Sequence, residues 1–416
     1  MSSQPPSVQL LQQQAASLLL YQSVLEDLVG QAFLDLLQAL QDGDLLEQLQ
    51  TYGCWFRSLA DRDRSWSDHL IERILHDDNP FSDRAQRFPP QALSPALLEA
   101  AKHDLQALHI LSRCGGETMA RWIPAGVIAF SAPTRDKTLL HRYHNWGDAV
   151  EDLATHYTQH GTGAFARYKA LRWHNGQLMG IPCPDAVQLS EIVGYEDQKA
   201  ALIQNIEFLL GGHRALHILL YGSRGSGKSS LVKGLLNEYA ARGLRLLEVG
   251  KSQLYDLPEI VELLRRRPQK FVLFVDDLSF EEDDEAFKAL KVVLEGSATA
   301  RTPNAIVCAT SNRRHLVREF FADRPRPLDN DEVHAWDTMQ EKLSFSDRFG
   351  LTLTFEPANQ ERYLVIVRHL AARSHLDIDA RELEFRAKQW AVRHNGRSGR
   401  TARQFIDFLQ AELSSN

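Results

Sequence analysis

Between an apolar run and a helical pattern, the chain reads Gly222-Ser223-Arg224-Gly225-Ser226-Gly227-Lys228-Ser229. This run fits the pattern G-x-x-x-x-G-K-[ST] at every fixed position. Its glycines let the backbone turn tightly and point N–H groups at an anion, and the following helix adds its positive end. An apolar strand is expected at 216–221 before it and a helix at 228–239 after it. The segment therefore predicts a phosphate-binding loop in an α/β domain.

The P-loop pattern also assigns roles to single residues. We expect Lys228 to reach the β- and γ-phosphates of ATP and the Ser229 hydroxyl to ligate Mg²⁺, an ion that prefers oxygen ligands. The rest of the loop and the residue after it are expected to bind the nucleotide through their backbone: Gly222, Ser223, Arg224, Gly225, Ser226, Gly227 and Ser230.

A second strand ends in two acids, since Phe271–Val275 is followed by Asp276 and Asp277. Asp276 is predicted to hold Mg²⁺, directly or through water, and the next acid to polarise the attacking water. A glutamate is usual at that second position, and aspartate is one methylene shorter. Glu281, four residues later, is the alternative catalytic acid. Glu281 begins an acidic run that continues to Glu285, and its other members are expected to form a solvated helix start.

A third apolar strand, at 305–309, leads to Asn312. We predict that the Asn312 side chain lies between the γ-phosphate and the acids that follow the second strand. Without the other two motifs, an asparagine in an ordinary turn after the strand would be the better interpretation.

Strands alternate with helices from about residue 186, which predicts a parallel sheet with covering helices. Helical patterns over 8–50 and 95–111, the latter with Ser94 as N-cap, predict a mainly helical N-terminal domain. Helices return after Pro357, with Asn359 as N-cap. The expected division is a helical domain at 1–175, a linker at 176–185 with two prolines, an α/β nucleotide-binding core at 186–355 and a helical segment at 356–416.

These motifs in this order resemble the AAA+ ATPases over about residues 186–416. The resemblance implies that the segment around Ile192, Val193 and Gly194 cradles adenine, that Asn312 is sensor 1 and that 356–416 is a lid. It also implies an arginine finger, Arg348, that contacts the γ-phosphate bound by a neighbouring subunit. Sensor 2 would be Arg403, with Arg400 as second choice.

Four longer runs, at 276–281, 309–315, 341–350 and 396–405, narrow the resemblance to the bacterial DUF815 family. This family implies a fold and ATP binding but no physiological task. Arg348 and Arg403 also have a plain alternative, in which each pairs with a surface carboxylate.

Composition limits the other classes of function. The net charge of −7 gives no global basic field of the kind that advertises nucleic acid. The four cysteines are far apart and favour free thiols over a zinc site or a disulfide framework. We expect no signal peptide, no presequence and no membrane span, and hence a cytoplasmic protein.

The first hypothesis for function is an ATP-driven machine that assembles as a homo-oligomer and acts on an unknown protein partner. The second is a switch or loader that hydrolyses ATP slowly and works through a protein or DNA partner, although no DNA-binding motif is recognisable. The long charged connection Arg318–Glu341 is expected to be either a partner-contact insertion or a plain mobile loop.

Overall fold

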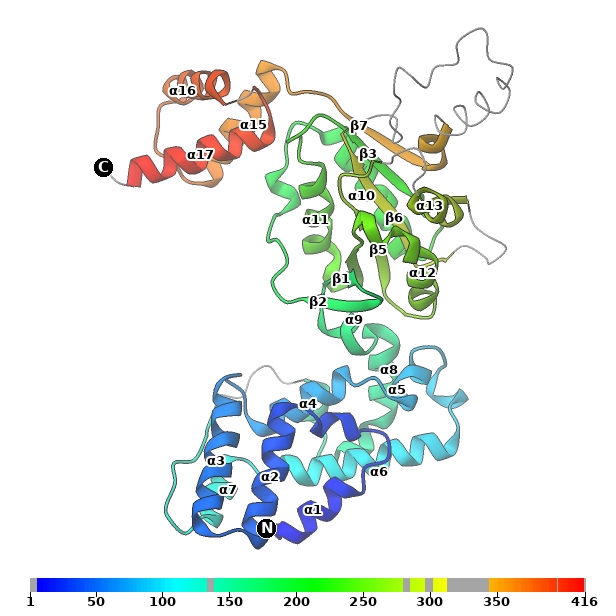
Figure 1. Cartoon of the computed structure of the whole chain (residues 1–416), viewed down its shortest axis with the longest axis vertical. Helices are drawn as coiled ribbons and strands as arrows, with labels where there is room; N and C mark the ends of the chain where they lie inside the picture. The colour runs from blue at the N-terminus through cyan, green and yellow to red at the C-terminus, as the bar shows by residue number, and fades with distance from the viewer. Residues whose placement is uncertain are drawn as a thin grey trace. The chain divides into compact units, whose positions relative to one another are not determined.

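The computed structural model describes residues 6–132, 138–279, 285–295, 302–312, 344–394 and 396–414. It divides into two compact units, Met1–Arg167 and Tyr168–Asn416, which are taken one at a time below (Figure 1). Glu281 and the connection 318–341 lie outside the described residues.

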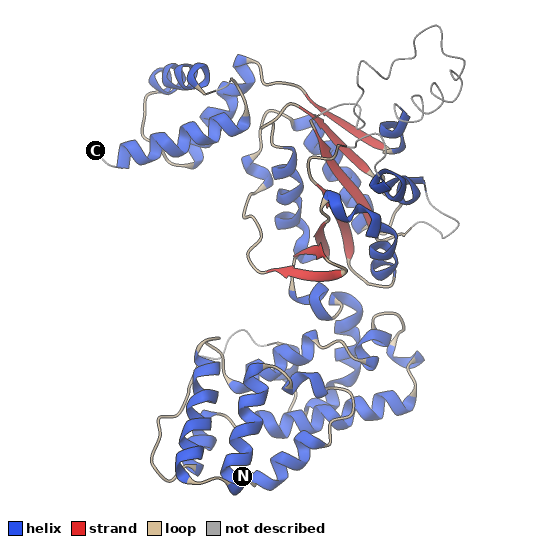
Figure 2. Ribbon diagram, in the orientation of Figure 1, coloured by secondary structure: helices blue, strands red, loops and turns tan. Residues whose placement is uncertain are grey.

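The first unit is helical throughout its described part, as predicted (Figure 2). Its longer helices are α1 (Val8–Ala16), α2 (Leu28–Asp42), α3 (Leu45–Ala60), α4 (Trp66–His76), α6 (Pro95–Ser112) and α8 (Val150–His160). The shorter ones are η1 (Gln22–Leu25), α5 (Pro80–Ala85), η2 (Pro90–Ala92), α7 (Gly116–Trp122), η3 (Leu139–Arg142), η4 (Trp146–Ala149) and α9 (Gly163–Arg167).

The single helical stretch predicted over 8–50 is instead divided into pieces. Asp27 and Asp44 each cap the start of a new helix by accepting a backbone N–H, from Gly30 and Glu47 respectively. Between α1 and α2 the backbone leaves the helix, where the buried Asp104 carboxylate accepts the N–H groups of residues 19–21. Capping side chains thus outweigh a continuous apolar period.

Aromatic residues fill the core of the first unit. Phe33 stacks on Trp66 with ring centroids 4.2 Å apart, and both side chains are fully buried or nearly so. Trp146 and Tyr157 are buried in the same cluster.

The second unit contains a seven-stranded sheet in the order β2-β1-β4-β5-β6-β3-β7. Every neighbouring pair is parallel except β1 and β2, which form an antiparallel hairpin. The strands are β1 (Ala170–His174), β2 (Gln177–Ile181), β3 (Ile218–Gly222), β4 (Leu244–Glu248), β5 (Lys270–Val275), β6 (Ala305–Ser311) and β7 (Leu351–Phe355).

Helices cover both faces of this sheet. Alternate strand residues such as Leu220 and Phe274 pack against α10 (Glu196–Leu210) and α11 (Lys228–Tyr239). Side chains of intervening residues are buried as well, on the face where Figure 1 shows α12 (Leu257–Arg265) and α13 (Glu285–Glu295). The remaining short helices of this core are η5 (Leu189–Glu191), η6 (Ala240–Arg242), η7 (Lys251–Asp256) and η9 (Ser344–Arg348). The predicted parallel α/β fold is confirmed.

The linker expected at 176–185 needs correction, because residues 177–181 form β2. Asn175 and Gly176 both have positive φ angles, 49° and 75°, and make the tight turn between β1 and β2. The boundary between the two compact units falls earlier, after Arg167. Pro182 and Pro184 end the strand, since a proline removes a ladder hydrogen bond.

Three helices form the C-terminal lid: α15 (Gln360–Arg373), α16 (Ala380–Arg393) and α17 (Gly399–Ser414). Asn359 caps α15 by accepting the Arg362 N–H at 2.8 Å, as predicted. The three helices share a core of their own, built around Tyr363, Val367, Phe405 and Leu409.

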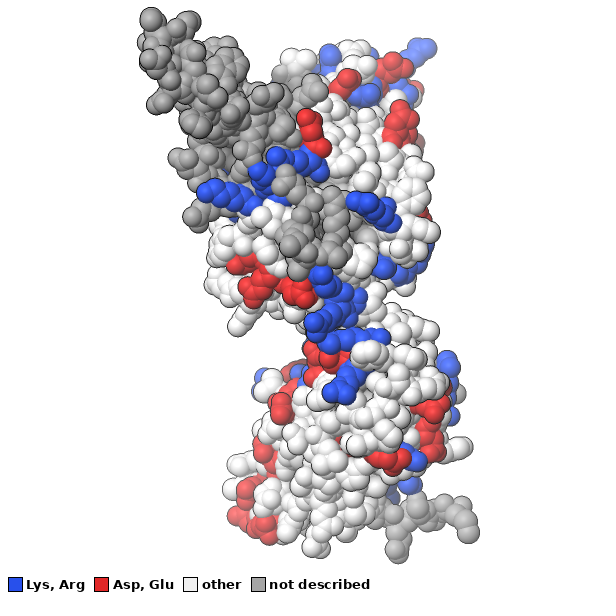
Figure 3. Space-filling model, turned by 90° about the vertical axis from the view of Figure 1, so that its right-hand side faces the viewer, with Lys and Arg blue, Asp and Glu red and all other residues white. Residues whose placement is uncertain are grey.

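None of the described helices is both long and apolar enough to cross a bilayer. All four cysteines are free thiols, and the described residues contain no group of three or more His, Cys, Asp or Glu side chains placed to hold a metal ion. On the face drawn in Figure 3, basic and acidic side chains are mixed.

Candidate functional site

The predicted phosphate loop connects β3 to α11 and has the backbone that its glycines permit. Gly222 has a φ of 140°, and a Cβ there would lie 2.0 Å from the carbonyl oxygen of Phe355 on β7. Only glycine lets β3 end so close to its neighbour, and the Ser223 N–H then donates to the same oxygen at 2.9 Å. Gly225 and Gly227 also have positive φ angles, 74° and 91°, so the loop curls before α11 begins.

Lys228 begins α11, and its side chain folds back over the loop. Its Nζ donates to the carbonyl oxygens of Gly222 and Ser223 at 3.0 and 2.8 Å and to Asn312 Oδ1 at 3.3 Å. The residue is only 7% exposed. Burial lowers the pKa of Lys228, while the negative charges of Asp276 and Asp277 act in the opposite direction. The lysine thus forms a cationic centre between the loop and the ends of β5 and β6.

The predicted metal-binding pair is in contact. Ser229 Oγ donates to Asp276 Oδ1 at 2.7 Å, although the two residues are 47 positions apart in the chain. Adjacent parallel strands and the helix after β3 bring them together at the carboxyl edge of the sheet. A hydroxyl and a carboxylate oxygen are ligands that Mg²⁺ accepts.

Asp277 and Asn312 are also adjacent. Asn312 Nδ2 donates to Asp277 Oδ1 at 2.6 Å, while Asn312 Oδ1 accepts from Lys228. Asp277 has a φ of 53°, a left-handed conformation that aspartate adopts more readily than most residues do. The amide therefore links the predicted phosphate-binding lysine to the predicted catalytic acid. The alternative acid, Glu281, is outside the described residues.

Two residues that sequence reasoning did not assign belong to this site. Thr310 lies on β6, two positions before Asn312. Its hydroxyl forms hydrogen bonds with the Asp276 carboxylate and with the Asp277 N–H. Glu191 forms an ion pair with the predicted sensor 2 residue Arg403 at 2.7 Å and another with Arg373 at 3.3 Å. Neither role could be seen in the sequence, because each depends on partners far away in the chain.

The lid reaches the phosphate loop through the start of α17. The Arg400 N–H donates to the Gly225 carbonyl oxygen at 3.1 Å, and a Cβ on Gly225 would lie only 2.9 Å from the Ser398 hydroxyl oxygen. From the same helix, Arg403 lines the cavity together with Glu191. The plain alternative for Arg403, a pair with a carboxylate, is thus present, but that carboxylate belongs to the cavity.

These groups enclose one cavity of about 630 Å³. Its lining includes apolar side chains and also the loop, the two acids, Thr310, Asn312, Arg400 and Arg403. The apolar members are Val187, Ile192, Val193, Ile366 and Leu370. Among the residues predicted to bind nucleotide, Gly194, Gly222 and Ser223 are not in its lining, whereas 224–230 are. Gly194 packs on Arg362 of the lid instead.

Arg348 is the one described residue of the predicted catalytic set that does not line the cavity. It lies in η9, directly before β7, and it is half-buried. Because β7 runs parallel to β3, with Leu351 beside Ile218 and Phe355 beside Gly222, Arg348 precedes the edge of the sheet opposite the P-loop. The length of a five-residue strand, about 15 Å, separates those edges.

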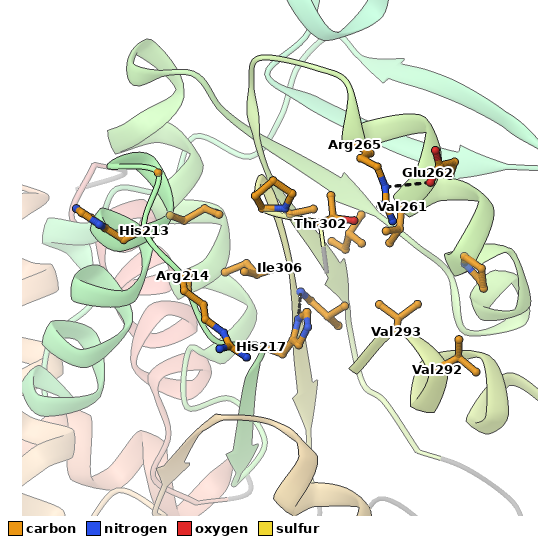
Figure 4. Close-up of a pocket in the computed structure, with 18 residues that line it drawn as sticks. His213, Arg214, His217, Val261, Glu262, Arg265, Val292, Val293, Thr302 and Ile306 are labelled. Carbon is orange, nitrogen blue, oxygen red and sulfur yellow. Dashed lines mark hydrogen bonds and ion pairs between the residues drawn. The ribbon is translucent and has the colours of Figure 1, made fainter. Parts of the chain in front are cut away.

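A second cavity of about 500 Å³ lies near that opposite edge (Figure 4). Its wall is largely apolar, with Val261, Val293 and Ile306, and its polar residues include His213, Arg214 and His217. His217 Nδ1 accepts the Val307 N–H at 3.0 Å, which anchors the ring to β6. It has neither a glycine-rich loop nor a lysine of the kind found in the first cavity.

Comparison with known proteins places this site in a family. The family described as "Protein of unknown function (DUF815)" matches residues 166–413, more than half of the 416-residue chain. The chain belongs to the DUF815 family. In this DUF815 protein the match takes in the sheet, the P-loop and the lid. The P-loop follows β3, the two acids follow β5 and the asparagine follows β6, in the order in which the motifs were predicted.

More distant similarities extend over parts of the chain. The replication factor C large subunit of Methanococcus maripaludis is 32% identical to the DUF815 protein over 114 residues, which are 25% of this chain and 24% of that relative. Thermotoga maritima RuvB T158V is 15% identical with a TM-score of 0.34, covering 54% of this chain and 72% of its own. AMPPCP-bound DnaA from Aquifex aeolicus is 14% identical with a TM-score of 0.38, covering 55% and 66%.

Proposed function

We propose that this DUF815 protein binds ATP with Mg²⁺ and hydrolyses it at an interface between two copies of the chain, driving a conformational change in a protein partner. The observation that carries the proposal is the continuous set of contacts Lys228–Asn312–Asp277, beside the Ser229–Asp276 pair, in one cavity. These are the groups that phosphoryl transfer requires, because its catalysis is mainly positioning and charge stabilisation.

The residues of the cavity fit ATP and Mg²⁺. The apolar part of the lining suits a base, and the polar part offers a lysine, the N-terminus of α11 and two lid arginines, Arg400 and Arg403, for phosphates. The buried Ser226 hydroxyl has no hydrogen-bond partner in the part of the chain that the structure describes. This is expected if the loop binds a phosphate group. Mg²⁺, when bound, neutralises phosphate charge, and Ser229 and Asp276 would hold it.

Within this proposal each residue has one task. Lys228 leaves the carbonyl oxygens that it now contacts and binds the terminal phosphates. Asp277 orients a water and acts as its general base. Asn312 holds the Asp277 carboxylate in position. Arg403 exchanges Glu191 for phosphate and so transmits the state of the site to α17.

The interface part of the proposal is supported by the direction of the sheet. Arg348 lies at the edge away from its own P-loop, so it cannot meet its own γ-phosphate without refolding the strand between them. A second copy can present Arg348 to the first copy's cavity. ATP would then be hydrolysed only where two chains meet.

A slow switch or loader, acting through a protein or DNA partner, is the second candidate. One contact favours it: the Asp277 carboxylate is engaged by Asn312 at 2.6 Å, and a short acid held in this way activates water poorly. The names of the distant relatives include a replication factor and DnaA, which keeps a DNA partner in consideration. Salt-dependent DNA binding would test it.

The first experiment measures phosphate release against protein concentration for wild type, Lys228→Ala and Arg348→Ala. Arg172→Ala serves as the matched control, since Arg172 is an exposed strand residue paired with Glu248. We expect the activity per chain of wild type and control to rise with concentration and both site variants to be inactive. Mixing the two inactive variants should then restore activity at about a quarter of the interfaces, where an intact P-loop meets an intact Arg348.

Two results would contradict parts of the proposal. An inactive mixture would show that Arg348 does not act on a neighbouring chain. If wild type binds ATP through Lys228 but releases no phosphate at any concentration, hydrolysis by the chain alone is wrong and the switch is the better account.

A further inference from the structure

Thr310 occupies a central position between the two acids. It lies on β6 next to β5, and it is 2% exposed. Its Oγ1 donates to Asp276 Oδ1 at 2.5 Å, and the Asp277 N–H donates to the same Oγ1 at 2.9 Å. One buried hydroxyl therefore contacts the side chain of the first acid and the backbone of the second.

The Thr310 hydroxyl acts as a donor to one acid and as an acceptor from the other. A threonine hydroxyl has one hydrogen to donate, and here it goes to the Asp276 carboxylate, while an oxygen lone pair accepts from Asp277. The Thr310 backbone adds a third contact, because its carbonyl oxygen accepts the Leu278 N–H at 2.7 Å. Three successive residues after β5 are thus attached to one residue of β6.

The turn that these bonds hold is an unusual one. Asp277 has a φ of 53°, and a residue other than glycine in the left-handed region costs free energy unless its surroundings fix it. This conformation directs the Asp277 carboxylate to Asn312, and Asn312 in turn contacts Lys228. Without an anchor on its N–H, the residue would be expected to relax to a negative φ and point its short side chain elsewhere.

We infer that Thr310 is a positioning residue of the nucleotide site: its hydroxyl orients Asp276 for Mg²⁺ and holds Asp277 in the backbone conformation that compensates for the shorter acid. The inference rests on the proposed function, because it concerns how the same site binds Mg²⁺ and activates water. It assigns to a strand threonine a role that requires the hydroxyl and not merely the shape of the side chain.

The test compares two substitutions of Thr310 in the full chain. Thr310→Val keeps the branched shape and removes the hydroxyl, whereas Thr310→Ser keeps the hydroxyl. The control is Thr352→Val on β7, an exposed strand threonine beside Leu219. Each protein is titrated with Mg²⁺ in the presence of a non-hydrolysable ATP analogue, and phosphate release from ATP is measured separately.

We expect Thr310→Val to need about tenfold more Mg²⁺ for half-maximal binding of the analogue, because a hydrogen bond to a charged acceptor is lost. At saturating Mg²⁺ its affinity should be close to that of wild type. Thr310→Ser and Thr352→Val should keep the wild-type midpoint. In phosphate release, Thr310→Val should lose activity that Thr310→Ser retains.

The inference is overturned if the Mg²⁺ midpoint of Thr310→Val equals that of wild type, or if Thr310→Ser shifts it as far as Thr310→Val does. Should the valine variant fail to fold, Thr310→Ala against Thr310→Ser poses the same question. The Mg²⁺ midpoint is measured by binding, so it decides about Thr310 even if wild type releases no phosphate, the result by which the proposed hydrolysis would fail.

Discussion

The shorter acid at position 277 is compensated by its surroundings. A glutamate would bring its carboxylate forward with an extra methylene, whereas Asp277 is turned by a left-handed backbone toward Asn312. The Asp277 carboxylate thus contacts Asn312, which in turn contacts Lys228, the residue predicted to bind phosphate. We therefore favour Asp277 over Glu281 as the acid that acts on water.

Replacing Asp277 with asparagine tests that choice. Asparagine also tolerates the left-handed region and can accept from Asn312, so we expect Asp277→Asn to bind ATP normally. Phosphate release should fall by at least about a hundredfold, since a general base is lost. Asp377→Asn, an exposed acid between two lid helices, is the control. Full activity in Asp277→Asn combined with loss of it in Glu281→Gln would assign the role to Glu281.

Residues with a fixed place in a motif could be predicted, and residues defined by their neighbours could not. Lys228 and Ser229 were assigned from the spacing of the P-loop pattern, and Asp276 from its place at the end of a buried strand after that pattern. The structure brings all three side chains to one cavity. A threonine in a strand, such as Thr310, is expected for its β-branched shape alone. Its role becomes visible only when β5 and β6 are side by side.

At the scale of elements, the contact between η5 and the lid can be tested, because one carboxylate of η5 pairs with two arginines of the lid. Glu191 pairs with Arg403 and Arg373, and His369 contacts the Ser190 carbonyl oxygen at 2.8 Å. Glu191 and Arg403 both line the nucleotide cavity. A phosphate that enters the cavity would meet Arg403 already paired with Glu191. The Glu191 carboxylate would repel the phosphate, because both are negatively charged.

Glu191→Gln should therefore bind ATP more tightly than wild type, by about two- to fivefold, since the pair is partly exposed and its worth is small. ADP affinity should change less, because the terminal phosphate is missing. Calorimetric titration of both nucleotides measures this. Glu384→Gln, which removes an equal charge from lid pairs with Arg368 and Lys388, should leave both affinities unchanged. Weaker ATP binding by Glu191→Gln would instead mean that the pair stabilises the closed site.

Elements with strong local signals were predictable, and short ones were not. β5, α11 and α6 combine an apolar period with clear starts, and the structure has them within a few residues of the expected bounds. β7 and the β1–β2 hairpin were missed. The sequence of β7 does alternate apolar and polar residues, but over only five positions, and neither β1 nor β2 keeps such an alternation over its whole length. The Asn175-Gly176 pair was the available signal for the hairpin.

At the scale of the whole molecule, the described residues of each unit have hydrophobic clusters of their own, and the cavity with the phosphate loop lies in the second unit. A ligand stabilises the body that binds it. Saturating ATP and Mg²⁺ should slow hydrogen exchange in the Tyr168–Asn416 unit. The rate should fall by up to about a hundredfold when the ligand concentration is about a hundred times its Kd. Peptides from the Met1–Arg167 unit should exchange at an unchanged rate.

Mass spectrometry of exchange with and without nucleotide measures this in the full chain, with Lys228→Ala as the variant in which no unit should respond. Equal protection of both units by ATP in wild type would contradict independent behaviour and would point to coupling between them. The sequence placed the end of the helical domain at residue 175, whereas the structure divides the chain after Arg167. The strands that extend the sheet precede the prolines that suggested a linker.

The P-loop and Arg348 lie at opposite edges of the sheet. If Arg348 acts on a neighbouring chain as proposed, one edge supplies the arginine, the donor edge, and the other receives a neighbour's arginine, the acceptor edge. A two-fold dimer pairs one surface with itself, so it does not join a donor edge to an acceptor edge. A head-to-tail series of copies does, and it must either close into a ring or stop at a last member whose cavity receives no arginine. An open series would therefore always contain one cavity that hydrolyses no ATP. The average rate of ATP hydrolysis per chain would increase as the series lengthens.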